Sequence, residues 1–158
     1  MRAGILPEWP IRPFRSRLRD PSRHRRTSPA TLHSAVVTNL LVVGAGGFLG
    51  AVARWGVGLL IARFWERDFP LGTLLINVTG CFVLGLFGTL AAERLPITPA
   101  WRLFVATGFT GAYTTFSTFE VETNRLVETG AGLTALAYVL TSVAAGFLAV
   151  RLGVALAR

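Results

Sequence analysis

Residues 108–119, GFTGAYTTFSTF, combine glycines and hydroxyl side chains inside an uncharged stretch that is long enough to lie at membrane depth. Glycines and β-branched threonines weaken an α-helix at this place. The hydroxyl groups can bond to the backbone groups that a break in the helix would free. We therefore predict a broken helix, and the alternative is a continuous helix whose hydroxyls bond to the preceding turn.

Four uncharged stretches account for nearly all of the chain after residue 34, at 35–53, 69–92, 103–119 and 129–150. Each has a length close to the about 20 residues that cross a bilayer as a helix. The chain is 52% hydrophobic and only 15% charged, whereas soluble domains average about 25% charged residues. The sequence predicts an all-α membrane protein with four transmembrane helices per subunit, of which the third is broken. The helices are expected at about 35–62, 70–92, 100–128 and 130–152.

Residues 1–34 differ from the rest of the chain, because they contain half of the arginines and only two acidic residues. This composition is typical of a disordered tail. The alternative is a start codon assigned too early. Either way, the four-helix domain is expected over residues 35–158.

The arginines outside the tail are almost evenly divided between the two sides of the predicted membrane. Arg54 is also left out of the count. The side that holds both chain termini has four arginines, Arg94, Arg102, Arg151 and Arg158, and the other side has three, Arg63, Arg67 and Arg125. Because basic residues set orientation, a balanced chain can insert both ways and form an antiparallel, dual-topology homodimer. If the arginine-rich tail is present, it fixes one orientation and requires a heterodimer with an inverted paralogue.

Glycines in the stretch VVGAGGFLGAVARW, residues 42–55, have the spacing of a dinucleotide-binding loop. Such a loop needs alternating strands and amphipathic helices around it, and the flanking stretches here are apolar on every side. In lipid, Gly46 and Gly50 have another use, since small residues let two helices approach closely. We predict a helix-packing surface here.

Polar residues recur at helical spacing in two of the apolar stretches. Thr73 and Asn77 lie four residues apart, and the spacing repeats in Thr134, Tyr138 and Ser142. Each stripe is expected to face inward. Hydrogen bonds between helices are one interpretation of them, and a transport pathway is the other.

Phe116 and Phe119 lie three residues apart and share a face if the helix resumes after the break. Their ring edges carry positive partial charge and can line a route for an anion, although a lipid-facing or core position is the common one. No carboxylate lies inside an uncharged stretch, since Glu120 and Glu122 follow the third one. This argues against a proton-coupled antiporter. Neutral donors suit a small, strongly hydrated anion.

Three blocks of the sequence resemble the signatures of the Fluc (CrcB) fluoride channels. They are GGFLGAVARW at 46–55, FPLGTLLINVTG at 69–80 and GFTGAYTTFSTF at 108–119. The resemblance covers about residues 36–155 and implies a multi-pass protein of the cell membrane, surrounded by lipid, that lets fluoride leave the cytoplasm passively and so lowers its toxicity. It implies two fluoride pores in a dual-topology dimer, with no enzyme activity and no nucleic-acid partner.

The resemblance also implies roles for individual residues. The backbone carbonyls of Gly111 and Thr114 would hold a structural sodium ion (Na⁺) at the dimer centre. Arg54 is assigned to structure or anion attraction, as Gly46 and Gly50 are to structure. The residues implied in the fluoride pore are Thr73, Asn77, Phe116, Ser117, Thr118, Phe119, Tyr138 and Ser142.

Two departures from the family pattern concern no proposed ligand side chain. Ala112 stands where a second glycine is common, and Trp55 where tyrosine is common. The alternative function, a dual-topology small multidrug-type exporter, needs a membrane-embedded glutamate in the first helix, and residues 35–62 contain none. A subunit that only packs helices would explain the glycines but not the clustered hydroxyls and phenylalanines.

Overall fold

The structure, a computed structural model, describes residues 29–65 and 67–158. In these ranges every regular element is helical, which confirms the all-α prediction. The elements are α1 (Pro29–Ala62), α2 (Leu71–Thr89), η2 (Leu90–Arg94), α3 (Pro99–Arg102), η3 (Leu103–Thr110), α4 (Gly111–Tyr113), α5 (Phe116–Glu128) and α6 (Gly132–Ala157). The prediction of a tail falls mainly on residues 1–28, which lie outside the described residues.

The first helix begins at Pro29, before the expected start at residue 35. Proline is favoured in the first turn of a helix, where its missing N–H has no partner to lose. The predicted start lies where the arginine-rich segment ends, at residue 34. The end of a charged segment does not mark where a helix begins. Residues 29–34 therefore belong to α1.

Three segments are long and apolar enough to cross a membrane, namely Leu32–Ala62, Leu71–Arg94 and Gly132–Ala157. They match three of the four predicted membrane helices. The segment expected as the remaining helix, 100–128, is divided into α3, η3, α4 and α5. The chain is thus a helical protein with the character of a membrane protein.

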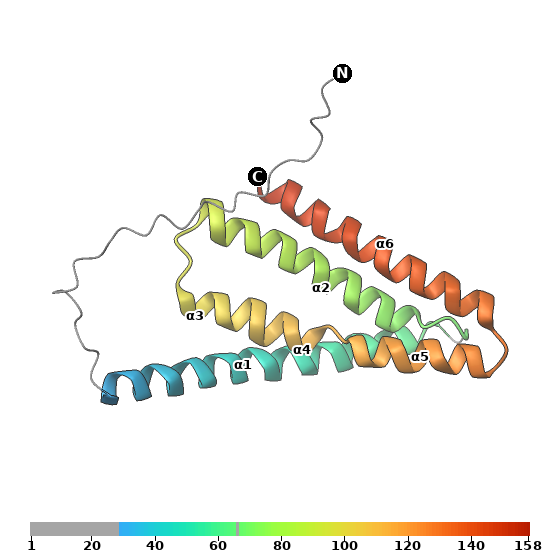
Figure 1. Cartoon of the computed structure of the whole chain (residues 1–158), viewed down its shortest axis with the longest axis horizontal. Coiled ribbons are helices and arrows are strands. Elements are labelled where there is room, and N and C mark those ends of the chain that lie inside the picture. Colours follow the sequence, from blue (N-terminus) through green and yellow to red (C-terminus); the bar gives the residue numbers. More distant parts are fainter. Residues whose placement is uncertain (1–28, 66) are drawn as a thin grey trace, which may run out of the picture.

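The helices pack in two main pairs, as Figure 1 shows. The row formed by α3, η3 and α4 lies along α1, and α2 lies along α6. The segment α5 continues the row beyond the break and also contacts α6. Every element that carries a predicted pore residue therefore lies near the break.

Glycines allow the backbones of α1 and η3 to touch. A Cβ atom at Gly46 would collide with the carbonyl oxygen of Phe104, and one at Gly50 with that of Phe109. On the other side of the contact, a Cβ at Gly108 would lie 2.7 Å from the carbonyl oxygen of Val43. This packing by small residues fixes η3, and with it the break, against α1.

Candidate functional site

The backbone leaves the helical conformation between α4 and α5, inside the stretch for which the sequence predicts a break. Thr114 has φ −79° and ψ 158°, and Thr115 has φ −150° and ψ 114°. Helix resumes at once, because the Thr115 hydroxyl caps α5 by accepting a hydrogen bond from the Thr118 N–H at 3.3 Å. The break is therefore two residues long.

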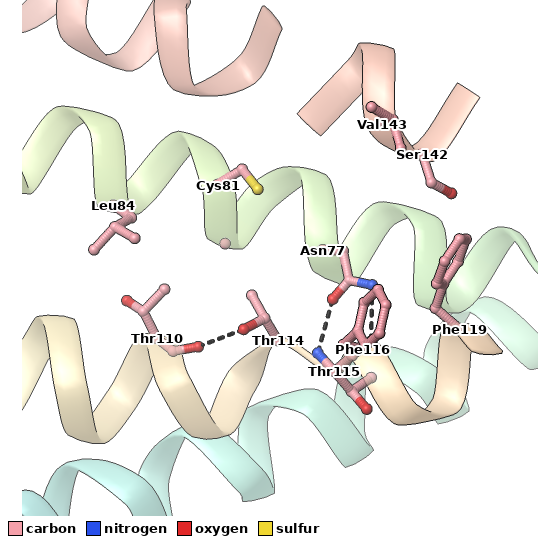
Figure 2. A pocket seen from close by; sticks show the side chains of 11 residues that line it. Asn77, Cys81, Leu84, Thr110, Thr114, Thr115, Phe116, Phe119, Ser142 and Val143 are labelled. Carbon is pink, nitrogen blue, oxygen red and sulfur yellow. Dashed lines mark hydrogen bonds between the residues drawn. The ribbon is translucent and has the colours of Figure 1, made fainter. Parts of the chain in front are cut away.

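Asn77 on α2 holds the extended backbone of Thr115. Its Nδ2 donates to the Thr115 carbonyl oxygen at 3.0 Å, and its Oδ1 accepts from the Thr115 N–H at 2.8 Å (Figure 2). A side-chain amide thus satisfies both polar backbone groups of a residue that is only 8% exposed. Asn77, one residue of the polar stripe predicted on α2, thus has the break itself as its partner.

This arrangement takes away the helical partners of two carbonyl groups. In a continuous α-helix, the N–H of residue 115 bonds to the carbonyl of Gly111, and that of residue 118 to the carbonyl of Thr114. Here the first N–H donates to Asn77 and the second to the Thr115 hydroxyl. The carbonyls of Gly111 and Thr114 therefore lack these two helical donors.

A cavity of about 310 Å³ lies beside the break, and we call it the break cavity. Most of its lining is apolar, with a few hydroxyl and amide groups, as Figure 2 shows. It brings together five of the predicted site residues from three helical segments. The lining residues are Asn77, Gly80, Cys81, Leu84, Thr110, Thr114, Thr115, Phe116, Phe119, Ser142 and Val143.

The two phenylalanines differ in their surroundings. Their ring centroids lie 5.7 Å apart. Phe119 is 8% exposed, and its ring packs against that of Tyr138 at 5.1 Å, whereas Phe116 is 73% exposed. One ring therefore forms part of the core of the chain, and the other projects from its surface.

A cluster of three polar side chains, of which Thr73 and Tyr138 are buried and Glu122 is half-buried, lies next to Phe119. The Thr73 hydroxyl donates to Glu122 Oε1, and the Tyr138 hydroxyl donates to Glu122 Oε2, both at 2.8 Å. Tyr138 is completely buried. The sequence predicts Thr73 and Tyr138 as site residues but misses Glu122, whose signal is its position one turn after Phe119 on the same helical face.

Glu122 also borders a second, polar cavity of about 430 Å³ at the end of α5. Two arginines, Arg67 and Arg125, line it together with Asp68. The Arg67 guanidinium lies over the Trp65 ring, 5.1 Å from its centroid. Glu122 therefore belongs to the cluster and also borders a cavity that is lined by charged side chains.

The remaining predicted residues lie outside these contacts or at their edge. Ser117 and Thr118 are exposed at the start of α5, where Thr118 Oγ1 accepts a hydrogen bond from the Thr115 hydroxyl at 2.9 Å. Arg54 is half-buried on α1 and is not among the residues that line the break cavity. These positions leave the roles implied for the three residues as predictions.

Comparisons with known proteins place the chain in a family. Residues 41–154 match the model of the family described as CrcB-like protein, Camphor Resistance (CrcB). The chain is 52% identical to the fluoride-specific ion channel FluC of Acidobacterium capsulatum over 72% of its own length and 90% of that protein. It is 47% identical to FluC of Solibacter usitatus, over 75% and 97% of the two chains. With FluC of Rhizobium meliloti it shares 42% identity over 77% and 98%. The chain therefore belongs to the CrcB family, which includes the fluoride-specific ion channels FluC.

Proposed function

We propose that this protein is a passive, fluoride-selective channel that lets fluoride leave the cytoplasm across the cell membrane. The observation that carries the proposal is the break held by Asn77, where two phenylalanines and several hydroxyl groups meet in one cavity. Backbone that leaves the helical conformation at membrane depth occurs where it is buried in protein or lines a pathway. The relatives named above are called fluoride-specific ion channels.

A passive channel suffices for export. Hydrogen fluoride is a weak acid that crosses membranes uncharged and dissociates in a more alkaline cytoplasm. The membrane potential then drives the anion outward through a selective opening, so no other source of energy is needed. Selectivity requires donors that replace the water around a small anion.

The chain offers such donors near Phe116 and Phe119. The amide of Asn77 has two N–H groups and spends one on Thr115, which leaves the other for an anion. Ser142 Oγ is buried and has no hydrogen-bond partner among the described residues. The positive edges of the two phenylalanine rings would also attract an anion, more weakly than these donors.

The carbonyls of Gly111 and Thr114 are the groups that would hold a sodium ion. Unwound carbonyls in broken membrane helices commonly bind this cation, and both groups have lost their helical donors. Gly111 is exposed on the single chain, so a second subunit can supply the matching pair of carbonyls. The ion would supply positive charge that joins the two subunits at the break.

In this proposal two chains form an antiparallel, dual-topology dimer, and the row from α3 to α5 is the fourth crossing. Phe116 supports it, because a phenylalanine that is 73% exposed on one chain can complete a pore beside a partner. An identical chain or an inverted paralogue would serve as that partner. The alternating directions of α1 and α2 in Figure 1 fit successive crossings of a membrane.

The test is fluoride efflux from liposomes that contain the purified protein. With sodium present and potassium ionophore supplied to balance charge, fluoride should leave much faster than from empty vesicles, while chloride stays inside. A fluoride electrode outside the vesicles measures the flux. Efflux equal to that of empty vesicles would refute the channel.

Replacement of Tyr138 by phenylalanine tests the cluster around Glu122. The change keeps the ring contacts but removes the O–H that donates to a carboxylate, so we expect stability to fall by about 2 kcal/mol and flux by about tenfold. The control is Tyr113→Phe, which removes a hydroxyl whose partner at 3.0 Å is the exposed, neutral Thr79. Thermal unfolding measures the stability of both variants, and efflux from liposomes measures their fluoride flux. If Tyr138→Phe conducts as well as Tyr113→Phe, the cluster is not part of the pathway.

A further inference from the structure

The hydroxyl of Thr110 is an unexplained polar group in the break cavity. Thr110 ends η3, is 3% exposed and lines the cavity. Its Oγ1 is buried and has no hydrogen-bond partner among the described residues. Its carbonyl, in contrast, accepts bonds from both the N–H and the hydroxyl of Thr114, at 3.0 and 2.9 Å. The side chain alone therefore lacks a partner.

Several other threonines, within helices or directly after them, satisfy their hydroxyls locally. Each donates to the carbonyl of the residue four positions earlier, as is usual for threonine in a helix. They are Thr38, Thr79, Thr89, Thr114, Thr123 and Thr129. Thr110 departs from this pattern at the end of a π-helix, whose wider turn places the earlier carbonyl differently.

The side chain of Thr110 lies on the side of its segment that faces α2, and the residue lines the break cavity. In Figure 2 it lies with Leu84 at one end of the lining, and Phe119 and Ser142 lie at the other. Ser142 also has an unpartnered buried oxygen. Two residues with unpartnered hydroxyls thus line opposite ends of the cavity, and most of the residues between them are apolar.

The class of ligand follows from the donors. A cation needs several oxygen ligands. Apart from the carbonyls of Gly111 and Thr114, which are assigned above to the sodium ion, the side chains of Cys81 and Leu84 beside Thr110 supply none. A single O–H among apolar walls is instead a strong donor to a small anion, because the surroundings screen charge weakly. A buried hydroxyl without a hydrogen-bond partner lowers the stability of the protein. Such groups are rare, so we expect this one to have a partner when the protein functions.

We infer that Thr110 Oγ1 donates a hydrogen bond to fluoride in transit, one turn beyond Thr114. The inference rests on the proposed channel function and extends its pathway along the break cavity to Leu84. Thr110 is thus a further pore residue, outside the set that the resemblance assigns.

The test compares Thr110→Val with Thr110→Ser. Valine keeps the shape and removes the donor, so fluoride efflux should fall about tenfold, while the Tm of the dimer stays equal or rises because a costly unpaired group is gone. Serine keeps the donor and should retain most of the flux. The control is Thr89→Val, which makes the same change at a hydroxyl bonded to the Gly85 carbonyl, outside the cavity.

The outcomes separate this inference from the proposed function. If wild-type protein conducts and Thr110→Val conducts equally, Thr110 is not in the pathway. If the valine variant loses Tm together with flux, the hydroxyl has a structural partner, and the inference is also wrong. Should valine prevent folding, Thr110→Ala, which only removes atoms, gives the same comparison. Wild-type protein without flux would instead refute the channel itself.

Discussion

Replacement of Gly50 by alanine is expected to destabilise the protein strongly, whereas the same change at Gly44 should stabilise it slightly. A Cβ at residue 50 would meet backbone atoms of Phe109, and a Cβ at residue 44 has nothing within 4 Å. Backbone atoms cannot rotate away as a side chain can. We therefore expect Gly50→Ala to lower the free energy of unfolding by about 3 kcal/mol or more, which is the upper end of the usual cost of overpacking a core. At an open helical site, alanine is favoured over glycine by about 1 kcal/mol.

Thermal unfolding of the two purified variants beside the wild type measures this difference, and size-exclusion chromatography reports whether each still assembles. The opposite signs make the comparison strict, since both substitutions add one methyl group to the same helix. If Gly50→Ala is as stable as Gly44→Ala, the backbones of α1 and η3 do not touch. The position of the break would then need another explanation.

The membrane helices could be predicted from the sequence because their cause is local. Uncharged stretches of about 20 residues have few alternatives to a helix that crosses a bilayer. The break could be predicted for a similar reason, since glycines and hydroxyls between 108 and 119 both weaken the helix and replace its bonds. The all-α fold needed no knowledge of contacts.

The π-helical turns of η3 could not be predicted in this way. Each N–H in such turns bonds to the carbonyl five residues earlier, and η3 packs against α1 at glycines from both elements. No spacing within residues 103–110 distinguishes this form from an ordinary helix.

The role of Glu122 could not be predicted from the sequence. A carboxylate at the end of an apolar stretch reads as the end of a membrane span. In the structure its two oxygens accept bonds from the hydroxyls of Thr73 and Tyr138, which come from different helices. The sequence identified both donors but could not pair them with their acceptor, because the pairing depends on the arrangement of three elements.

Replacement of Asn77 by leucine should remove fluoride flux by at least about a hundredfold, since it leaves both backbone groups of Thr115 without partners at a cost of about 1–3 kcal/mol each. The backbone has two ways to respond. Either Thr115 stays buried with unpaired groups, or its N–H returns to the Gly111 carbonyl and the helix becomes continuous. Both responses destroy the site, because the first loosens the break and the second removes a carbonyl from the proposed sodium site.

The two responses can be told apart by the effect of sodium on stability. A cation that binds only the folded protein raises its Tm by mass action, so wild-type protein should melt higher in sodium than in a large organic cation. A continuous helix in Asn77→Leu would abolish that difference. The control is Asn124→Leu, which removes an exposed amide bonded to Glu128 at 2.9 Å and should change neither flux nor the sodium effect. Flux in Asn77→Leu within about twofold of wild type, a difference of under about 0.5 kcal/mol, would show that the amide does not hold the break.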